Sequence, residues 1–414
     1  MSFGALGLCD ELLETLAQRG YTKPTPIQIE AIPAVLDKRD VVAIAQTGTG
    51  KTAGFTLPML QLLFDGPRPR ANCVRALIIT PTRELAAQVA QSVLHYSQGM
   101  NIHSAAVFGG VRIEPQISML QAGSDVLIAT PGRLIDLYNR EAISFEQLEL
   151  LVLDEADRML DLGFIDDIHH IQKLLPSNRQ TLMFSATFSK AIKMLAKSML
   201  SNPRLIEVAG ASKAVDRIEQ KVHPVDKDRK IELLIHLFKK NDWHQVLVFS
   251  RTKRGADSLV ILLEAAGISA ASIHSNRTQH ARTLALENFK NGSVAALVAT
   301  DIASRGIDIS QLPCVVNLDL PYVAEDYVHR IGRTGRAGTS GLAVSLFSND
   351  ESKQLKAIER VVGVKFELET VEGFEPSIKV VENATQDDEY GNFEADTKPQ
   401  GRRHPRGRKG RGRK

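Results

Sequence analysis

Short apolar runs alternate with longer stretches of helical periodicity along most of this chain, and this alternation limits the fold more than any other feature. Few polar residues interrupt the runs between residues 41 and 208. Strands without polar alternation are typically buried on both faces of a parallel sheet. The pattern therefore predicts an α/β fold with a doubly wound, mostly parallel sheet. The predicted strands are Val41–Ala45, Ala76–Thr80, Ser104–Phe108, Val126–Ala129, Leu150–Leu153 and Thr181–Phe184, with helices such as Thr82–Gln98 and Phe188–Leu200 between them.

The pattern stops at residues 209–217, which lack an apolar period, and then restarts. We therefore predict two tandem domains, covering residues 1–208 and 218–364, with a linker at 209–217. Residues 365–396 are predicted to form a loosely structured acidic extension, and whether they dock on a domain stays open. The second set of strands is predicted at Gln245–Phe249, Ser269–Ile273, Ala295–Ala299, Cys314–Asn317 and Gly341–Leu346, with a helix at Arg254–Ala266.

The imbalance between basic and acidic residues is confined to the end of the chain. Residues 397–414 hold nine Lys or Arg and no acid, residues 382–396 hold six acids and no base, and the rest holds 42 of each. The Arg/Gly/Lys segment 397–414 cannot bury a core, so we predict a disordered basic tail. Such a tail typically attracts a polyanion, either nucleic acid or a membrane surface, in a salt-sensitive and nonspecific way. Alternatively, it only keeps the protein soluble.

The cysteines and the N-terminus indicate the compartment. Cys9, Cys73 and Cys314 form no C-x-x-C pair, so neither a disulfide framework nor a thiolate zinc site is predicted. The histidines show no ligand-like spacing with cysteines or acids. The first residues lack a basic n-region, and no apolar run reaches the roughly eighteen residues of a membrane span. We expect a soluble, cytoplasmic protein.

A glycine-rich segment follows the first predicted strand and precedes a helical stretch, which is the context of a phosphate-binding loop. Glycines let backbone N–H groups converge on phosphate oxygens at a helix N-terminus. Within the segment, Lys51 can neutralise the β- and γ-phosphates, and the Thr52 hydroxyl can ligate Mg²⁺. Ala45 stands where such loops usually begin with glycine. The segment consists of Ala45, Gln46, Thr47, Gly48, Thr49, Gly50, Lys51 and Thr52.

Three acids follow the strand Leu150–Leu153 within the segment Asp154-Glu-Ala-Asp157. A carboxylate at the carboxyl edge of a parallel strand is where the partner of a phosphate-bound Mg²⁺ should lie. We predict that Asp154 holds the metal, directly or through water. Glu155 could then deprotonate an attacking water, which favours hydrolysis over transfer to another acceptor. The local alternative is a solvated strand end or a helix N-cap.

The two motifs together resemble the DEAD-box family of ATP-dependent RNA helicases, over nearly all of residues 1–364. The opening residues and Ala53–Pro58 are similar to the bacterial RhlE-type branch. The resemblance implies two RecA-like domains that use ATP and Mg²⁺ and act on RNA. Its further landmarks appear in order at Gly20–Gln28, Pro81–Ala86, Gly109–Gly110, Thr130–Leu134, Ser185–Thr187, Gln279–Arg282, Ala299–Asp308 and His329–Arg336.

The resemblance assigns residues to the nucleotide in both domains. Tyr21 would stack on the adenine and Gln28 would bind its edge, as an amide can, although local sequence alone makes Gln28 a surface amide. Asp308 would contact the ribose. Since the second domain has no phosphate loop, Arg333 and Arg336 would act as arginine fingers, with an effect on the rate of about 10³-fold or more.

The resemblance also implies residues that couple the nucleotide to RNA. The hydroxyls of Ser185 and Thr187 would bond to Asp157, and His329 would bridge to the same acids. Residues that grip the sugar–phosphate backbone position a strand without discriminating between bases, and contacts to 2′-hydroxyls would favour RNA. These residues are Thr82, Arg83, Gly110, Thr130, Gly132 and Arg133 in the first domain and Arg251, Arg282 and Thr300 in the second.

The sequence thus predicts RNA-stimulated ATP hydrolysis coupled to closure of two domains, with local unwinding or remodelling of RNA. Ribosomal or RNA-decay assemblies are candidate partners, and the oligomeric state stays open. One alternative is an ATP-switched RNA clamp in which unwinding is incidental. Another is a DNA-directed ATPase, which would respond to single-stranded DNA. A P-loop kinase is disfavoured, because Glu155 and the paired arginines suit attack by water.

Overall fold

The computed structural model describes residues 2–45, 48–208, 218–301, 312–334 and 341–377. Four predicted site residues, Gln46, Thr47, Asp308 and Arg336, lie outside the described residues. The predicted linker, residues 378–396 of the acidic extension and the basic tail lie outside them as well. The other predicted site residues can be located in the fold.

The first sheet has seven parallel strands in the order β3-β4-β2-β5-β6-β1-β7. Non-consecutive neighbours in this order require helical crossovers, as the alternating pattern predicted. The carboxyl ends of all seven strands lie at one edge, which is where ligands bind in such sheets. The strands are β1 (Val41–Ile44), β2 (Val74–Ile79), β3 (Ser104–Val107), β4 (Ser124–Ala129), β5 (Leu150–Leu153), β6 (Gln180–Ser185) and β7 (Arg204–Glu207).

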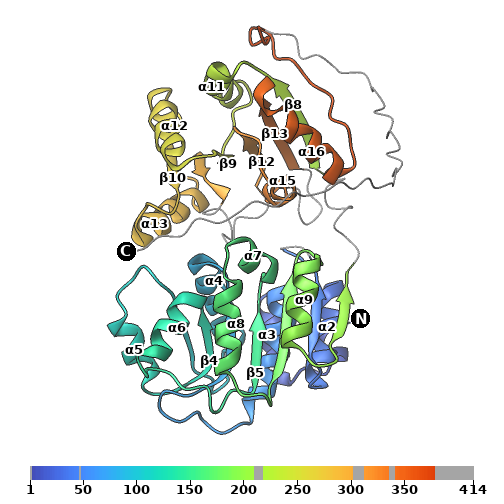
Figure 1. The fold of residues 1–414 in the computed structure, drawn as a ribbon, viewed down its shortest axis with the longest axis vertical. Helices are drawn as coiled ribbons and strands as arrows, with labels where there is room; N and C mark the ends of the chain where they lie inside the picture. The colour runs from blue at the N-terminus through green and yellow to red at the C-terminus, as the bar shows by residue number, and fades with distance from the viewer. Residues whose placement is uncertain (1, 46–47, 209–217, 302–311, 335–340, 378–414) are drawn as a thin grey trace, which may run out of the picture. The chain divides into compact units, whose positions relative to one another are not determined.

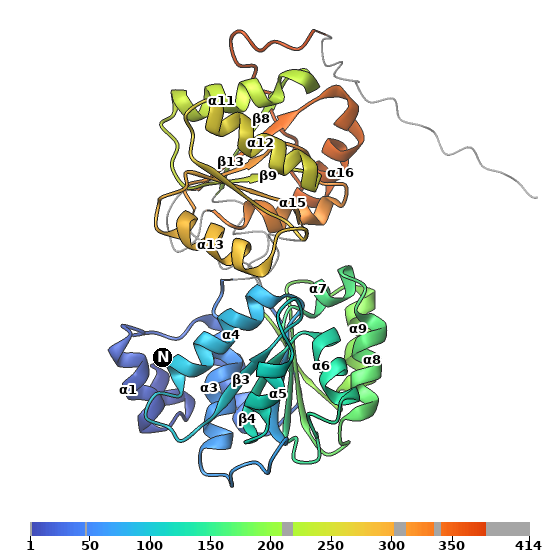
Figure 2. The ribbon, with the colours of Figure 1, turned by 90° about the vertical axis from the view of Figure 1, so that its left-hand side faces the viewer.

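Helices cover both faces of this sheet (Figure 2). Because successive side chains of a strand point to opposite faces, Val41 and Ala43 of β1 join one core and Val42 and Ile44 join the other. The first core lies beneath α1 (Asp10–Gln18), α2 (Pro26–Leu36), α3 (Lys51–Phe64) and α4 (Arg83–Tyr96). The second lies beneath α5 (Glu114–Leu120), α6 (Pro131–Asn139), α7 (Ala156–Asp161), α8 (Ile165–Leu174) and α9 (Lys190–Met199).

The second sheet has six parallel strands in the order β10-β11-β9-β12-β13-β8. Apart from the edge strand β7, this is the strand order of the first sheet, with β8 in the place of β1. At the edge of the second sheet, β8 lies beside β13 (Figure 1). The strands are β8 (Ile218–Pro224), β9 (Val246–Phe249), β10 (Ala270–Ile273), β11 (Ala296–Ala299), β12 (Cys314–Asn317) and β13 (Gly341–Phe347). The helices are α11 (Lys230–Lys240), α12 (Lys253–Ala265), α13 (Gln279–Lys290), α15 (Ala324–Ile331) and α16 (Ser352–Val362).

The first part of the acidic extension packs on the second sheet. Phe366, Val371 and Phe374 are buried, although residues 365–377 contain almost no regular secondary structure. Leu368 forms an isolated parallel bridge with Val222 of β8. These residues therefore belong to the fold of the second domain and cover its edge strand, which would otherwise expose unpaired backbone groups.

The predicted parallel α/β architecture of both domains is confirmed, and every predicted strand is present within two residues of its predicted ends. Two strands were not predicted, β7 and β8, and both lie at the edge of a sheet. Edge strands are partly exposed: Glu207 and Glu219 face solvent, so the apolar runs that mark central strands are missing. Within the described ranges, no helix is long and apolar enough to cross a membrane.

Candidate active site

The phosphate-loop segment connects β1 to α3, as its position in the sequence predicted. Gly48 and Gly50 have φ values of 83° and 91°, which side chains other than glycine rarely adopt. A β-carbon on Gly50 would also collide with the side-chain nitrogen of Gln28. Glycine is therefore required there for two reasons, the backbone conformation and the close approach of a neighbour.

Lys51 begins α3 and is only 5% exposed. Its ammonium nitrogen has no hydrogen-bond partner among the residues that the structure describes. A buried cation without a partner is costly, and an anion at the N-terminus of a helix would compensate both the charge and the unpaired N–H groups. The loop and Lys51 thus fit a phosphate chain.

Gln28 lies beside the phosphate loop rather than on the surface, since it is 4% exposed. Its amide nitrogen donates to the carbonyl of Gly50 at 3.1 Å, and its amide oxygen accepts from the N–H of Thr25 at 2.9 Å. An amide has two donors and two acceptor lone pairs, so one of each remains for a ligand. Gln28 therefore links the loop to α2, and its contact with adenine stays a prediction.

The acidic motif follows β5 at the same edge of the sheet, with Asp154 and Glu155 both buried. Burial raises the pKa of Asp154 to about 7, while Lys51 opposes this rise and Glu155 adds to it. Within the described chain, one carboxylate oxygen of Glu155 has no partner. Glu155 also has a left-handed φ of 53°. A divalent cation would compensate these buried acids, so the residues present fit Mg²⁺.

Asp157 contacts the Ser185–Thr187 segment, but through backbone groups rather than the hydroxyls that we predicted. One of its carboxylate oxygens accepts from the backbone N–H groups of Ala186 and Thr187, both at 3.0 Å. The Ser185 hydroxyl instead donates to the carbonyl of Thr187 at 2.8 Å. The turn after β6 therefore points backbone N–H groups at the carboxylate, and the Ser185 hydroxyl bonds within the turn.

Predicted RNA-binding residues of the first domain gather at the ends of β2, β3 and β4. The guanidinium of Arg83 lies against Gly110, where a β-carbon would collide with it. Arg133 donates to the carbonyl of Val111 at 3.0 Å, and another of its nitrogens is buried without a partner among the described residues. Thr82 and Thr130 are the N-caps of α4 and α6, and Gly132 is exposed in the first turn of α6.

Of the predicted RNA-binding arginines of the second domain, Arg251 already has a carboxylate partner. It pairs with Glu351 at 2.6 Å. To hold a phosphate, Arg251 would have to share or exchange this partner. Arg282 lies in the first turn of α13. Thr300 is buried at the end of β11.

His329 and Arg333 lie at the end of α15 and just beyond it, and Arg333 is 6% exposed. Between them, Arg330 forms a two-point ion pair with Asp301, at 2.6 and 2.8 Å. Arg330 also donates to the side chain of Asn317 at 3.0 Å. This residue therefore holds the segment that carries the predicted arginine finger.

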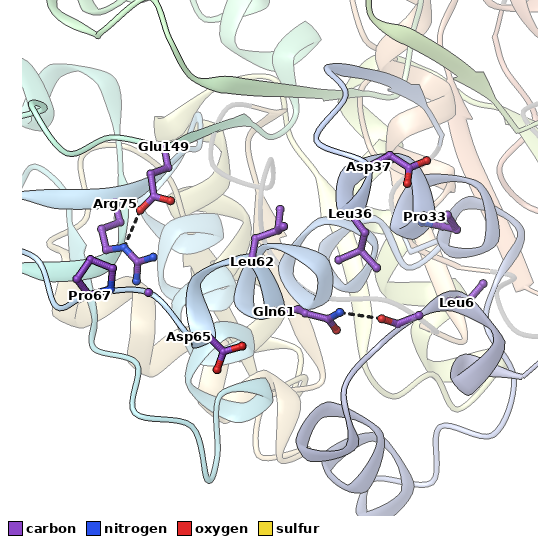
Figure 3. A pocket seen from close by; sticks show the side chains of 12 residues that line it. Leu6, Pro33, Leu36, Asp37, Gln61, Leu62, Asp65, Pro67, Arg75 and Glu149 are labelled. Carbon is purple, nitrogen blue, oxygen red and sulfur yellow. Dashed lines mark hydrogen bonds and ion pairs between the residues drawn. The ribbon is translucent and has the colours of Figure 1, made fainter.

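A hollow in the first domain lies at the other edge of the sheet. Its volume is about 750 Å³, and it is lined by the C-terminal turns of α2 and α3 and by Arg75 and Glu149 (Figure 3). Arg75 pairs with Glu149 at 2.7 Å and with Asp125 at 3.1 Å. The side chain of Gln61 is engaged by the backbone of Gly7 and Cys9. These polar groups serve the fold, and the amino edge of a parallel sheet is not where a nucleotide binds.

Sequence reasoning missed Arg330 and Glu351, which orient predicted site residues. Glu351 is 2% exposed and binds both Arg251 and Lys230. It follows β13 by a few residues, the same signal that selected Asp154 after β5, and that signal was not applied to the second domain. Arg330 stands inside the motif His329–Arg336, where its neighbours alone received roles.

Comparison with known proteins gives a family for both halves of the chain. Residues 25–195 match the model of the DEAD/DEAH box helicase family, and residues 229–338 match that of the helicase conserved C-terminal domain. These two matches cover more than half of the chain.

Relatives align over nearly the whole chain. The ATP-dependent RNA helicase RhlB of Pseudomonas syringae is 40% identical over 89% of this chain and 94% of its own length. The DEAD-box ATP-dependent RNA helicase RhpA of Helicobacter pylori is 40% identical over 89% and 74%. Dbp5 of S. cerevisiae, in a structure bound to RNA and ADP BeF3, is 32% identical, with a TM-score of 0.80 over 91% of this chain and 95% of its own. The RhlE-type branch stays a prediction.

Proposed function

Because the chain belongs to the DEAD-box family of ATP-dependent RNA helicases, we propose that it hydrolyses ATP in a reaction that RNA stimulates. The observation that carries this proposal is the buried ammonium of Lys51, which has no hydrogen-bond partner among the described residues, with Asp154 and Glu155 at the same sheet edge. Relatives are named ATP-dependent RNA helicases, and the solved Dbp5 structure is bound to RNA and ADP BeF3, which supports both ligands.

The residues of the phosphate loop and of the acidic motif have different roles in hydrolysis. Lys51 and the N–H groups of the loop bind the phosphate chain and neutralise its charge. Thr52 and Asp154 would hold Mg²⁺, which supplies further charge neutralisation when bound. Glu155 accepts the proton of the attacking water through its unpartnered oxygen. Water is the acceptor in this arrangement, so the reaction is hydrolysis.

The second domain contributes charge that the first domain lacks. Arg333, together with Arg336, stabilises the negative charge that develops on the γ-phosphate in the transition state. The ion pair of Arg330 with Asp301 fixes the segment just before Arg333. In this proposal the two domains close on ATP, and the active site is complete only in the closed state.

RNA is held by the loops at the carboxyl edges of both sheets. Arg83 and Arg133 offer guanidinium groups at the ends of β2 and β4, and Arg251 and Thr300 follow β9 and β11. Contacts of this kind grip the sugar–phosphate backbone without discriminating between sequences. If RNA favours the closed state, ATP and RNA must tighten each other's binding by the same factor. Closure would thereby separate or remodel short duplexes locally.

Steady-state ATP hydrolysis by the full chain with Mg²⁺ tests this function. We would compare reactions without nucleic acid, with single-stranded RNA and with single-stranded DNA of equal length. We expect stimulation by RNA alone. Equal turnover in all three reactions would contradict the coupling to RNA, and stimulation by DNA alone would favour the DNA-directed ATPase.

The variant Glu155→Gln tests the assigned base in the same assay. We expect it to lower turnover about 10²- to 10⁴-fold, because the base that accepts the proton of water is lost. Glu141→Gln is a matched control, since Glu141 also has a left-handed φ, 56°, but is exposed and lies away from the site. Equal turnover of the Glu155 and Glu141 variants would show that Glu155 is not the base.

A further inference from the structure

Two tyrosine side chains meet on the first domain, and only one of them has an assigned role. The rings of Tyr21 and Tyr96 have centroids 6.5 Å apart and planes tilted by 58°. This separation and tilt lie in the range of favourable aromatic pairs. Tyr21 is the residue proposed to stack on adenine, whereas Tyr96 lies 75 residues further along the chain and belongs to none of the motifs.

The two rings differ sharply in exposure. Tyr96 is 8% exposed and belongs to the core beneath α1, α2, α3 and α4, whereas Tyr21 is 47% exposed. The Tyr21 ring is therefore supported by a buried neighbour and still has a large open surface. A planar ring that is fixed on one side and open on another can accept a flat ligand at little cost in conformational entropy.

A backbone hydrogen bond anchors Tyr21. Its N–H donates to the carbonyl of Leu16 at 3.0 Å, just beyond the end of α1, and Gly20 before it has a left-handed φ of 73°. This segment between α1 and α2 is a short turn, so the backbone alone leaves the side chain free to choose its rotamer. The contact with Tyr96 supplies the restraint on the ring itself.

The hydroxyl of Tyr96 can also take part in this restraint. Burial raises the pKa of Tyr96, and its interactions with Tyr21 raise it further, while Arg19 opposes them. The phenol therefore stays protonated at any pH of interest and can donate a hydrogen bond. Tyr96 contributes both an aromatic surface and a polar group to the Tyr21 side chain.

We propose that Tyr96 is a positioning residue for the nucleotide base: it holds the Tyr21 ring in the orientation that stacks on adenine. The inference rests on the proposed use of ATP. It assigns no contact between Tyr96 and the nucleotide, because Tyr96 acts through Tyr21.

The position of Tyr96 on helix α4 has a second consequence. The helix begins at Arg83, beside the loops proposed to hold RNA, and ends at Tyr96. Tyr96 thus joins the adenine-stacking ring to the helix that carries an RNA-binding arginine at its other end.

A double-mutant cycle in the full chain tests the proposal. We would measure the equilibrium affinity for ADP by calorimetry in wild type, Tyr96→Leu, Tyr21→Ala and the double variant. We expect Tyr96→Leu to weaken ADP binding about threefold to tenfold, the range for the loss of one aromatic pair. In the Tyr21→Ala background, the same change should weaken ADP binding less than twofold, because the ring it positions is gone.

Inorganic tripolyphosphate is the second probe, because it has no base to stack. Its affinity should be the same in wild type and Tyr96→Leu. Tyr138→Leu is the matched control. Tyr138 stacks on Phe145 with centroids 5.6 Å apart and packs against the core of the opposite face, and we expect wild-type ADP affinity from this variant. Tyr96→Phe, which keeps the ring, should lie between wild type and Tyr96→Leu.

Two results would overturn the positioning role. One is that Tyr96→Leu weakens ADP and tripolyphosphate equally, which indicates damage to the whole site. The other is that the effects of the two substitutions on ADP add, which indicates that Tyr96 does not act through Tyr21. Neither result contradicts ATP hydrolysis by this chain, whereas failure of the wild-type protein to bind ADP would contradict both proposals.

Discussion

The two domains share one strand order and differ most at the turn after the equivalent strands β1 and β8. After β1 the chain forms the phosphate loop and enters α3 at Lys51. After β8 it reaches Asp226 and the short 3-10 helix η2 (Lys227–Arg229). Asp226 accepts hydrogen bonds from the N–H and hydroxyl of Ser377, and the guanidinium of Arg229 lies 4.7 Å from the ring centre of Phe374.

In the second domain, residues of the extension therefore contact the turn that corresponds to the phosphate loop of the first. An anion at that turn would meet the carboxylate of Asp226 instead of a lysine ammonium. The two domains thus share an architecture, and the residues of this loop decide its chemistry. The second domain can serve the nucleotide only from another position, which is why Arg333 is the side chain that we propose for this role.

Other equivalent turns have stayed alike. Thr82 caps α4 after β2 and accepts from Leu85 N–H at 3.3 Å, and Thr252 caps α12 after β9 and accepts from Gly255 N–H at 2.9 Å. An arginine proposed to hold RNA stands beside each cap, Arg83 in one domain and Arg251 in the other. In our proposal, the two domains thus present similar turns to RNA and different turns to ATP.

The largest effect is expected from Arg333. Replacement with alanine removes the charge that the second domain supplies to the transition state, so turnover should fall about 10³-fold or more. Steady-state hydrolysis with saturating RNA measures it. Arg360→Ala, an exposed arginine on α16, should leave turnover unchanged. If Arg333→Ala hydrolyses ATP at the wild-type rate, the division of roles between the domains is wrong.

The two lysines at the divergent turns come next. Lys51→Ala should lower turnover at least about 100-fold, because the phosphate charge loses its neutralising partner. Lys227→Ala, in the turn after β8, should have no effect on turnover, since Lys227 pairs with Asp350 on the surface at 2.7 Å. Parallel hydrolysis assays compare them. A similar loss in both variants would mean that both turns serve the nucleotide.

Removal of the Phe374 side chain tests whether the extension completes the second domain. Phe374 is 7% exposed, and Phe374→Ala should lower the free energy of unfolding by about 3 kcal/mol. Because this residue packs in the core beneath α11 and α12, the loss should be confined to the second domain. Urea titration followed by fluorescence of Trp243 reports on that domain. An unchanged midpoint would show that residues 365–377 do not stabilise it.

Thermal unfolding of the nucleotide-free protein over a range of pH tests the cost of burying the charged carboxylate of Asp154. The folded-state pKa of Asp154 is about 7 against an ordinary value of 3.8, so its protonated form favours folding. The contribution is complete below about pH 4 and is lost as the pH rises to about 7. Asp154→Asn should therefore gain a few degrees in melting temperature over wild type at pH 8 and little at pH 4. If the melting temperatures of the variant and wild type differed equally at both pH values, the raised pKa of Asp154 would be contradicted.

The smallest effect is expected from the basic tail. Deletion of residues 397–414 removes nine positive charges that can contact phosphates, so RNA binding should weaken and its salt dependence should flatten. Maximal turnover should stay close to wild type, since both domains are intact. Fluorescence anisotropy with labelled RNA over a series of salt concentrations measures the slope. If the truncated chain showed the same dependence of RNA affinity on salt, the domains alone would account for RNA binding.

Sequence predicted the central elements of both domains because buried parallel strands leave long apolar runs. It missed β7 and β8, whose exposed residues interrupt such runs. The phosphate loop and Asp154 were found because a strand directly precedes each of them. Arg251 pairs with Glu351, which lies 100 positions further along the chain. Tyr21 likewise contacts Tyr96, which lies 75 positions further along. Pairings of this kind follow from how the elements pack, which a local pattern does not contain.

The hydroxyl bonds predicted for Ser185 and Thr187 show a different limit. The right residues were named, and Asp157 does contact their segment, but backbone N–H groups make the contact. Which group of a residue meets its partner depends on the path of the turn after β6. A motif identifies the residue types that are present and leaves that path open.

In our proposal, domain closure couples the binding of ATP to the binding of RNA, and an equilibrium measurement tests this coupling. The affinity of the full chain for a non-hydrolysable ATP analogue with Mg²⁺ should be measured without nucleic acid and with saturating single-stranded RNA. Closure of both domains on the two ligands predicts that RNA tightens the analogue at least about fivefold. An affinity that is the same with and without RNA would contradict the coupling, even if ATP is hydrolysed.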